Sequence, residues 1–211
     1  MTDNLDAIAH YYAGKLAAHG ERAQGVDWNG ETSQALRFGQ LLKVVDTEAA
    51  FSLNDLGCGY GALRDQLSES CPRCDYAGYD IAPEMVAAAR NRFAGMPATR
   101  FEVAAVPDRI ADFTVASGIF NVRLDRTNEA WTRYVETTLE HMDRTSARGF
   151  AFNCLTSYSD ENRKRPDLYY CDPGTAFDWC RSRYSRNVAL LHDYDLYEFT
   201  IIVRKSGSGA R

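Results

Sequence analysis

A glycine-rich segment, Asp55–Gly61, is the part of the sequence best suited to binding a ligand. It follows an apolar stretch that predicts a strand and precedes a stretch that predicts a helix. Glycines let the backbone turn tightly and approach a ligand without a Cβ in the way. The N-terminus of the helix beyond offers free N–H groups and partial positive charge. We therefore expect a cofactor to lie against this loop.

The residue types in the loop leave its ligand open. Gly57, Gly59 and Ala62 fit the dinucleotide-binding pattern G-x-G-x-x-G/A, and a tight strand-to-helix turn without a ligand is a further alternative. Asp55 favours a different ligand, because its carboxylate can face an ammonium group but would repel a pyrophosphate. The loop therefore favours a cofactor that carries an ammonium group over NAD.

Two other pairs of residues could do chemistry. His192 and Asp193 are the best candidates for an acid–base pair, since histidine titrates near neutral pH. Adjacent residues of a strand point to opposite faces, however, so we name no catalytic base. Cys71 and Cys74 have the C-x-x-C spacing of zinc and redox sites, but no second pair of ligands follows them. We predict no metal site.

Alternating strands and helices must position these residues. Such alternation predicts an α/β fold with a parallel sheet and helices on both faces. The short polar turn His192–Asp195 predicts that the last two strands form an antiparallel hairpin. The expected strands are 51–56, 76–81, 99–103, 112–117, 149–154, 188–191 and 196–203, and the expected helices are 5–16, 31–45, a helix beginning at 63–67, 83–93, 131–142 and 177–184.

Two motifs together resemble a known family. Asp-Leu-Gly-Cys-Gly-Tyr-Gly at 55–61 resembles motif I of the class I methyltransferases that use S-adenosylmethionine (SAM), and Tyr79–Met85 looks like their second motif. Asp80 follows Asp55 by 25 residues, the spacing that one helix and one strand require. The resemblance covers about residues 51–205. It implies SAM as the cofactor and a Rossmann-like, seven-stranded, mostly parallel sheet in the order 3-2-1-4-5-7-6, with strand 7 antiparallel.

The resemblance also implies where SAM binds, because ligands of open α/β sheets lie outside the carboxyl ends of the strands. Asp80 would accept hydrogen bonds from both ribose hydroxyls, and the loop after the third strand would pack on adenine. Arg37 on a preceding helix could hold the SAM carboxylate. The predicted cofactor contacts are Tyr12, Arg37, Asp55, Gly57, Cys58, Gly59, Gly61, Asp80, Ile81, Met85, Ala104, Ala105, Val106, Ser117 and Gly118.

The methyl acceptor is expected to be a small molecule. A net charge of -5 disfavours nucleic acid, and the sequence lacks the Asn-Pro-Pro-Tyr motif of adenine-specific DNA methyltransferases. A protein or RNA methyltransferase and a non-catalytic SAM-binding protein remain as alternatives. The longest irregular segment, Leu155–Asp172, follows the fifth strand, and long loops of this kind are often functional. The predicted acceptor contacts are Trp28, Asn121, Tyr158, Tyr169 and Tyr170.

The chain is expected to form one methyltransferase domain over residues 1–205. It would comprise an N-terminal helical cap at 1–46, which acts as a lid, and a Rossmann-like core at 51–205, followed by a flexible tail at 206–211. We see no signal peptide and no apolar run of membrane-spanning length, so we expect a cytoplasmic protein with no membrane partner. A homodimer is compatible with the sequence.

Overall fold

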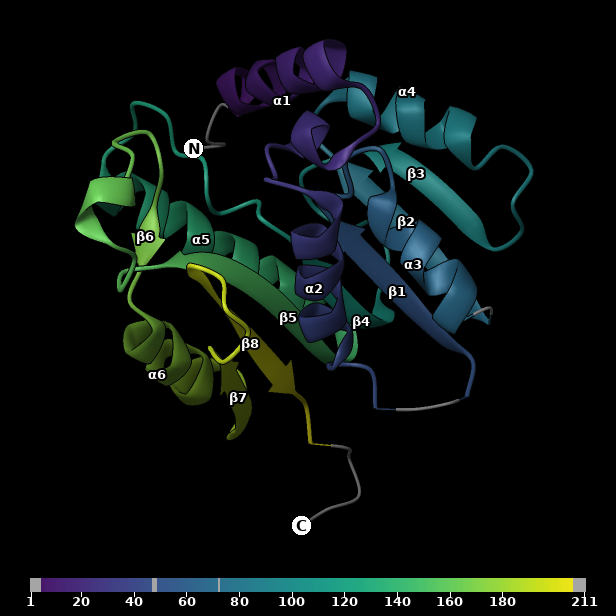
Figure 1. The fold of residues 1–211 in the computed structure, drawn as a ribbon. Coiled ribbons are helices and arrows are strands. Elements are labelled where there is room, and N and C mark those ends of the chain that lie inside the picture. Colours follow the sequence, from purple (N-terminus) through teal and green to yellow (C-terminus); the bar gives the residue numbers. More distant parts are fainter. Residues whose placement is uncertain (1–4, 47–48, 72, 207–211) are drawn as a thin grey trace.

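A mixed sheet forms the centre of the protein (Figure 1). The structure is a computed structural model and describes residues 5–46, 49–71 and 73–206. Its strand order is β3-β2-β1-β4-β5-β8-β7, with the short β6 paired to β5 beside this path. In the described residues, the strands are β1 Phe51–Leu56, β2 Cys74–Asp80, β3 Thr99–Val103, β4 Ala111–Ala116, β5 Ser146–Thr156, β6 Tyr170–Cys171, β7 Asn187–Leu191 and β8 Glu198–Arg204.

Strand β8 runs in the opposite direction to both of its neighbours, β5 and β7. The pairs that join β1, β2, β3, β4, β5 and β6 are all parallel. With β6 set aside, the observed strand order matches the predicted order. The antiparallel strand is β8, the last strand along the chain, as predicted. The Rossmann-like fold class predicted from the sequence is therefore confirmed.

Helices cover both faces of the sheet. Residues of α2, α3 and α4 pack on one face, and residues of α5 and α6 pack on the other. Figure 1 shows α2 and α3 in front of the sheet and α5 behind it. The helices are α1 Asp6–His19, α2 Glu31–Leu42, α3 Ala62–Ser70, α4 Pro83–Arg92, α5 Asn128–Arg144 and α6 Pro173–Arg183, with short 3-10 turns η1 Ala23–Val26 and η2 Glu161–Arg163.

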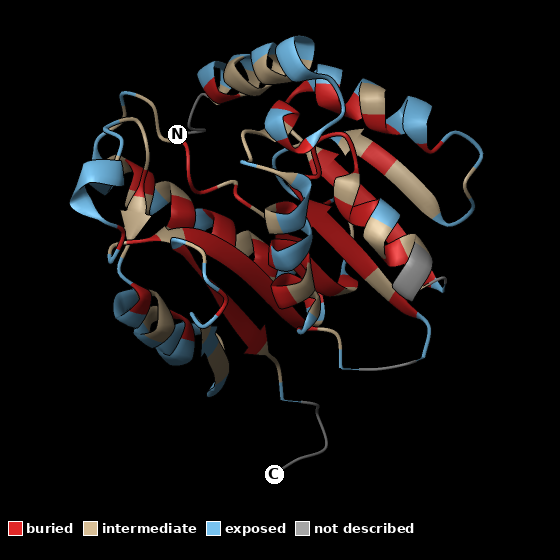
Figure 2. Ribbon diagram, in the orientation of Figure 1, coloured by how far each residue is buried: buried red, intermediate tan, exposed pale blue. Residues whose placement is uncertain are grey.

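Alternation along the central strands fills two cores, one on each side of the sheet. Figure 2 shows the central strands coloured as buried along most of their length. Phe150 and Phe152 of β5 belong to the core beneath α5 and α6, whereas Ala151 belongs to the core beneath α2. Strand β8 repeats this pattern, with Ile201 on the α5 side and Ile202 on the α2 side. Even-numbered residues of β8 therefore face α2, because successive side chains of a strand point to opposite faces.

The structure differs from the sequence-based prediction mainly after β5. That strand runs from Ser146 to Thr156, longer than the predicted 149–154, and the unpredicted β6 pairs with its end. A strand of two residues carries no periodicity that a sequence could reveal. Helix α6 begins earlier than predicted because Asp172 caps it, accepting a hydrogen bond from the backbone of Thr175.

The two ends of the chain contribute differently. Helix α2 carries Phe38 and Leu41 into the core beneath it, so this part of the predicted cap at 1–46 packs as a layer of the fold. Apart from Ser206, the predicted tail at 206–211 lies outside the described residues. None of the helices in the described residues combines the length and the apolar character needed to span a bilayer.

Candidate functional site

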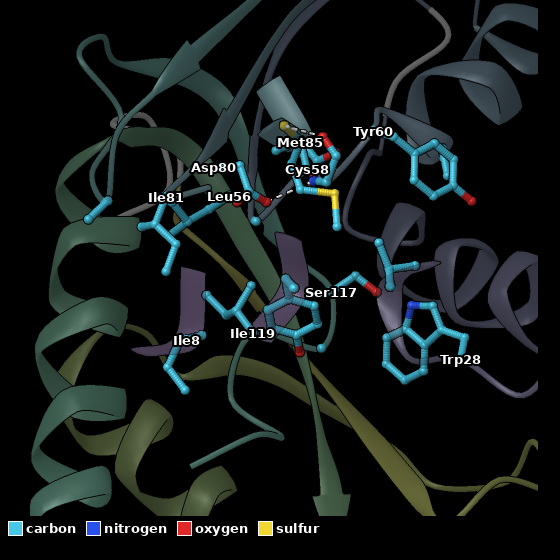
Figure 3. A pocket seen from close by; sticks show the side chains of 18 of the residues that line it. Ile8, Trp28, Leu56, Cys58, Tyr60, Asp80, Ile81, Met85, Ser117 and Ile119 are labelled. Carbon is cyan, nitrogen blue, oxygen red and sulfur yellow. Dashed lines mark hydrogen bonds between the residues drawn. The ribbon is translucent and has the colours of Figure 1, made fainter. Parts of the chain in front are cut away.

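A cavity lies where the carboxyl ends of β1, β2 and β4 meet the N-terminal segment (Figure 3). We call this space the first cavity. It forms where β1 has a neighbouring strand on each side, because the loops that follow β1 and β4 diverge there. It is lined by most of the predicted cofactor contacts: Tyr12, Asp55, Gly57, Cys58, Gly59, Asp80, Ile81, Met85, Ala104, Ala105, Ser117 and Gly118.

The glycine loop after β1 has the backbone shape that the sequence predicts. Gly57 and Gly59 both have left-handed backbones, with φ of 77° and 54°. A Cβ at Gly57 would lie 2.0 Å from Ile119 Cγ2, and one at Gly59 would lie 3.0 Å from Val26 Cγ1. The loop therefore needs glycine for its conformation and for its close approach to the cavity walls.

Asp80, at the end of β2, holds this loop. Its Oδ2 accepts a hydrogen bond from Gly59 N, and its Oδ1 accepts one from Ala82 N, each at 2.9 Å. Burial raises the pKa of Asp80, and these backbone donors oppose the rise. Because each carboxylate oxygen has two lone pairs, both oxygens keep the capacity to accept a hydrogen bond from a ligand.

Asp55 is the more deeply buried of the two acids, with 2% of its surface exposed. Its Oδ2 accepts a hydrogen bond from the Tyr76 hydroxyl at 2.6 Å. Burial is the main cause that raises the pKa of Asp55 to about 7, and the negative charge of Asp80 adds to the rise. A cationic group in the first cavity would reverse this effect, because it would favour the ionised carboxylate.

The raised pKa of Asp55 predicts how stability depends on pH. The folded chain holds this proton more tightly than the unfolded chain, whose carboxyl has an ordinary pKa of 3.8. The contribution to stability is therefore complete below that value and is lost as pH rises towards about 7. Between pH 5 and pH 8 we expect the ligand-free protein to lose about 2–3 kcal/mol through this group.

Urea unfolding of the ligand-free protein and of Asp55→Asn across this pH range measures that contribution. The variant should be the more stable protein at pH 8, and its stability should change less with pH. Its amide oxygen can still accept the hydrogen bond from Tyr76. Parallel stability curves for the two proteins would contradict the prediction.

Ser117, at the end of β4, supplies a polar group without a partner. Its Oγ is buried and has no hydrogen-bond partner in the part of the chain that the structure describes. A buried hydroxyl that loses its bonds to water costs free energy unless a partner replaces them. Figure 3 shows Ser117, Asp80, Met85 and Trp28 around the same space. The first cavity thus combines acidic side chains, an unpartnered hydroxyl and apolar walls.

Trp28 separates the first cavity from a second one. It lines both cavities, and its indole packs on Gly118, where a Cβ would lie 2.4 Å from the ring. Gly118 has φ of 76° and also lines both cavities. The missing side chain at Gly118 therefore allows the tryptophan to form the boundary between two adjoining spaces.

The second cavity has aromatic walls and balanced charge. Tyr12, Trp28, Tyr170 and Tyr197 contribute aromatic rings to it. Among the described residues that line it, the basic ones are Arg37, Arg163 and Arg165 and the acidic ones are Asp27, Asp195 and Glu198. Equal numbers of opposite charges give this space no overall attraction for a polyanion.

The structure brings only part of the predicted acceptor set to the second cavity. Trp28, Asn121 and Tyr170 line it. Tyr158 does not, and 69% of its surface is exposed. Tyr169 points instead into the core beneath α5, where its hydroxyl lies 2.9 Å from that of Thr132. The irregular segment carried no periodic pattern from which these orientations could be read.

Three predicted cofactor contacts lie outside the first cavity. Gly61 packs against the core, where a Cβ would lie 2.6 Å from the Phe93 ring, and Val106 is partly exposed. Arg37 lines the second cavity, and its guanidinium already has a carboxylate partner in Glu198. The structure therefore places Arg37 at the second cavity and not at the first, where SAM is predicted to bind.

The candidate acid–base pair lies apart from both cavities. His192 and Asp193 are exposed, and neither lines the first or the second cavity. The imidazole of His192 stacks on the Tyr158 ring at 6.0 Å between centroids. The structure therefore places neither residue in the lining of either cavity. In the described residues, no three metal-binding side chains form a cluster.

A buried polar network beside Gly118 was not anticipated. Gly118 N donates to Asn153 Oδ1 at 2.7 Å, and Asn153 Nδ2 donates to Glu198 Oε2 at 3.0 Å. Arg37 Nε donates to the same carboxylate oxygen at 2.8 Å, and burial raises the pKa of Glu198. The sequence did contain a signal: Glu198 is an acid at the start of a mostly apolar strand, at a position whose alternation faces the core.

Sequence comparison connects the chain to methyltransferases. A family described as "Methyltransferase domain" matches residues 54–145, which contain the glycine loop, Asp80 and the loop after β4. A Mycobacterium tuberculosis protein with the curated name "Putative methyltransferase Rv1506c" is 55% identical over 165 residues, which cover 78% of this chain and 99% of that protein.

Solved structures share the fold at low sequence identity. Human N-acetylserotonin methyltransferase, solved with SAM, has a TM-score of 0.66 and 18% identity over 98% of this chain, which spans 60% of that protein. Magnesium protoporphyrin IX methyltransferase from Synechocystis PCC 6803, solved with S-adenosylhomocysteine (SAH), has a TM-score of 0.65 and 13% identity over 97% of this chain and 100% of that one. N-methyltransferase NodS from Bradyrhizobium japonicum WM9, also solved with SAH, has a TM-score of 0.65 and 14% identity over 94% and 98% of the two chains.

Proposed function

The chain belongs to the class I SAM-dependent methyltransferases, and from that premise we propose that it binds SAM in the first cavity and methylates a small molecule held in the second. The adjoining position of the two cavities on either side of Trp28 and Gly118 carries this proposal. A methyl donor and its acceptor must be in direct contact, so the transfer would take place where the two cavities adjoin, beside Trp28 and Gly118.

The residues of the first cavity fit SAM. Its acids suit a ligand with an ammonium group and ribose hydroxyls, and the unpartnered Ser117 Oγ suits a polar ligand atom. In this proposal Asp80 accepts hydrogen bonds from the ribose, Asp55 faces the ammonium group, and Ala104 and Ala105, in the loop after β3, contact the adenine. Gly57 and Gly59, with their left-handed backbones, keep the loop surface that faces the first cavity free of side chains. When bound, SAM supplies a methyl group on a positively charged sulfur that is ready to leave.

The protein's own contribution is to position and desolvate the acceptor. Holding two reactants in line removes much of the entropic cost of their meeting. The aromatic side chains of the second cavity exclude water, and aromatic contacts typically add about 0.5–1.5 kcal/mol each to the binding of a flat ligand. An acceptor with a reactive lone pair then needs no metal and no strong base.

Charge supports a small acceptor over a nucleic acid. Proteins that bind nucleic acid neutralise several phosphates with a basic surface, whereas the charges that line the second cavity are balanced. The relatives named for N-acetylserotonin and for magnesium protoporphyrin IX act on small molecules and share this fold. Both observations favour a metabolite as the acceptor.

Thermal shift tests the cofactor half of the proposal. SAM and SAH should each raise the melting temperature, because a ligand that binds only the folded state stabilises it by about 2.7 kcal/mol at a hundred times its Kd. NAD should have no effect. A shift with NAD and none with SAM or SAH would contradict the proposal.

A metabolite screen tests the acceptor half. We expect incubation of a metabolite mixture with SAM to yield a product heavier by one CH₂ group, detected by mass spectrometry, together with SAH. The same mixture without enzyme is the control. Methylation of protein or RNA in a cell extract, with no methylated metabolite, would favour a macromolecular acceptor instead.

A further inference from the structure

Arg37 and Glu198 form a buried ion pair in the wall of the second cavity. Arg37 comes from α2 and Glu198 from the first position of β8, and their Nε and Oε2 atoms are 2.8 Å apart. Their side chains are 7% and 1% exposed. Burying an ion pair removes two charges from water, so it contributes little to stability by itself. Stability therefore does not explain why the pair is buried here, and we consider a role in ligand binding.

The hydrogen bonds of this pair are incomplete. Glu198 Oε2 accepts from Arg37 Nε and from Asn153 Nδ2, but Glu198 Oε1 has no partner among the described residues. Within the same described part of the chain, Arg37 Nη1 also has none. Buried polar groups in folded proteins are almost always paired. Among the described residues, one acceptor and one donor thus remain without a partner, in two residues that line the second cavity.

We propose that Arg37 and Glu198 recognise the methyl acceptor by binding an uncharged group that both donates and accepts hydrogen bonds, a hydroxyl or a carboxamide. This inference rests on the proposed function, because it places the acceptor in the second cavity. A hydroxyl can donate to Glu198 Oε1 and accept from Arg37 Nη1. An ammonium group would meet the positive charge of Arg37, and a carboxylate would meet the negative charge of Glu198.

The other charges around the second cavity do not alter this preference. Asp27 is already paired with Lys15 at 2.6 Å and accepts a hydrogen bond from the Tyr11 hydroxyl. Arg165 is paired with Asp167 at 2.5 Å. Arg163 and Asp195 add one charge of each sign to the lining. The ion pair therefore acts within an approximately neutral lining.

The ion pair is also tied to the boundary with the first cavity. Asn153 bridges Glu198 to the backbone N–H of Gly118. The guanidinium of Arg37 lies over the Trp28 ring, 3.9 Å from its centroid. A group bound to Arg37 and Glu198 is therefore held beside Trp28 and Gly118, where the two cavities adjoin.

Calorimetry with SAH analogues tests the inference without knowledge of the natural acceptor. In these probes a nitrogen replaces the sulfur and carries an alkyl tail that cannot be transferred, in a series of increasing length. The tail ends in a hydroxyl, carboxamide, methyl, ammonium or carboxylate group. At the best length, the hydroxyl or carboxamide tail should bind about tenfold more tightly than the methyl tail, the gain of one or two net hydrogen bonds.

Two variants should change this preference in opposite ways. Glu198→Gln replaces an acceptor by an amide donor and leaves Arg37 positive, so the carboxylate tail should become the tightest binder. The double variant Arg37→Leu, Glu198→Leu leaves no unpaired charge, so it keeps the fold and should favour the methyl tail. Glu102→Gln, in an exposed ion pair with Arg90, is the matched control and should bind as the original protein does.

The outcomes separate the inference from the proposed function. Failure of SAH itself to bind any of these proteins would overturn the proposed function and this inference with it. If SAH binds but the methyl or a charged tail is preferred by the original protein, the inference alone is overturned. The same holds if the hydroxyl preference persists in both the single and the double variant. Melting curves confirm that each protein is folded.

Discussion

Replacing Asp80 by alanine is expected to weaken SAM binding by about 1.5–3 kcal/mol, which is roughly ten- to 150-fold. The variant loses the carboxylate that would hold the ribose. It also releases the N–H groups of Gly59 and Ala82, which Asp80 fixes at 2.9 Å. The loss of the ligand contact and the loosening of the loop both lower the affinity for SAM.

Isothermal titration calorimetry with SAH measures this effect, and Asp80→Asn provides the matched control. Asparagine keeps the size of the side chain and one carbonyl oxygen, but it loses the charge and half of the acceptor capacity. Its affinity should fall between those of the original protein and Asp80→Ala. Unchanged affinity in the alanine variant would remove Asp80 from the cofactor site.

Gly59→Val is expected to abolish measurable SAM binding. Gly59 has φ of 54°, a conformation that costs a residue with a side chain about 1–2 kcal/mol. Its Cβ would lie 3.0 Å from Val26 and 3.9 Å from the sulfur of Met85, two residues that line the first cavity. A branched side chain would therefore strain the loop and also occupy the space of the cofactor.

Gly95→Val separates these two causes. Gly95 has φ of 80°, but a Cβ there would meet nothing within 4 Å. This variant should lose stability through backbone strain and should bind SAH with the affinity of the original protein. If Gly59→Val and Gly95→Val bind SAH equally well, the glycine loop does not contact the cofactor.

The sequence predicts the cofactor side of the molecule in detail because that side depends on local signals. The predicted strands 51–56 and 99–103 match β1 and β3 in both bounds. Most predicted contacts in the first cavity lie at the carboxyl end of a parallel strand or in the loop that follows it, whereas Tyr12 comes from α1 and Met85 from α4. Once the strand order is known, the topology brings those loops together. The predicted contacts outside the first cavity are Gly61, which packs against the core, Val106, which is exposed, and Arg37, which lines the second cavity.

The acceptor side could not be predicted in the same way because its contacts join distant parts of the chain. Arg37 and Glu198 are 161 residues apart, and their meeting depends on how α2 packs and on the register of β8. Tyr158 and Tyr169 lie in a segment without a repeating pattern. One side chain turns to solvent and the other to the core, and only tertiary packing decides which.

The reversed direction of β8 has a consequence for how such an enzyme can diversify. The parallel strands present their last residues at the ligand-binding edge, whereas β8 presents its first residue there, Glu198. Under the proposals above, a residue that sets specificity for the acceptor and the motifs that bind SAM are then far apart in the sequence. Mutation near the start of β8 can explore new acceptors while the motifs that hold SAM remain intact. The antiparallel direction of β8 thus provides a position, Glu198, at which a substitution can change the preference for the acceptor without changing the SAM-binding motifs.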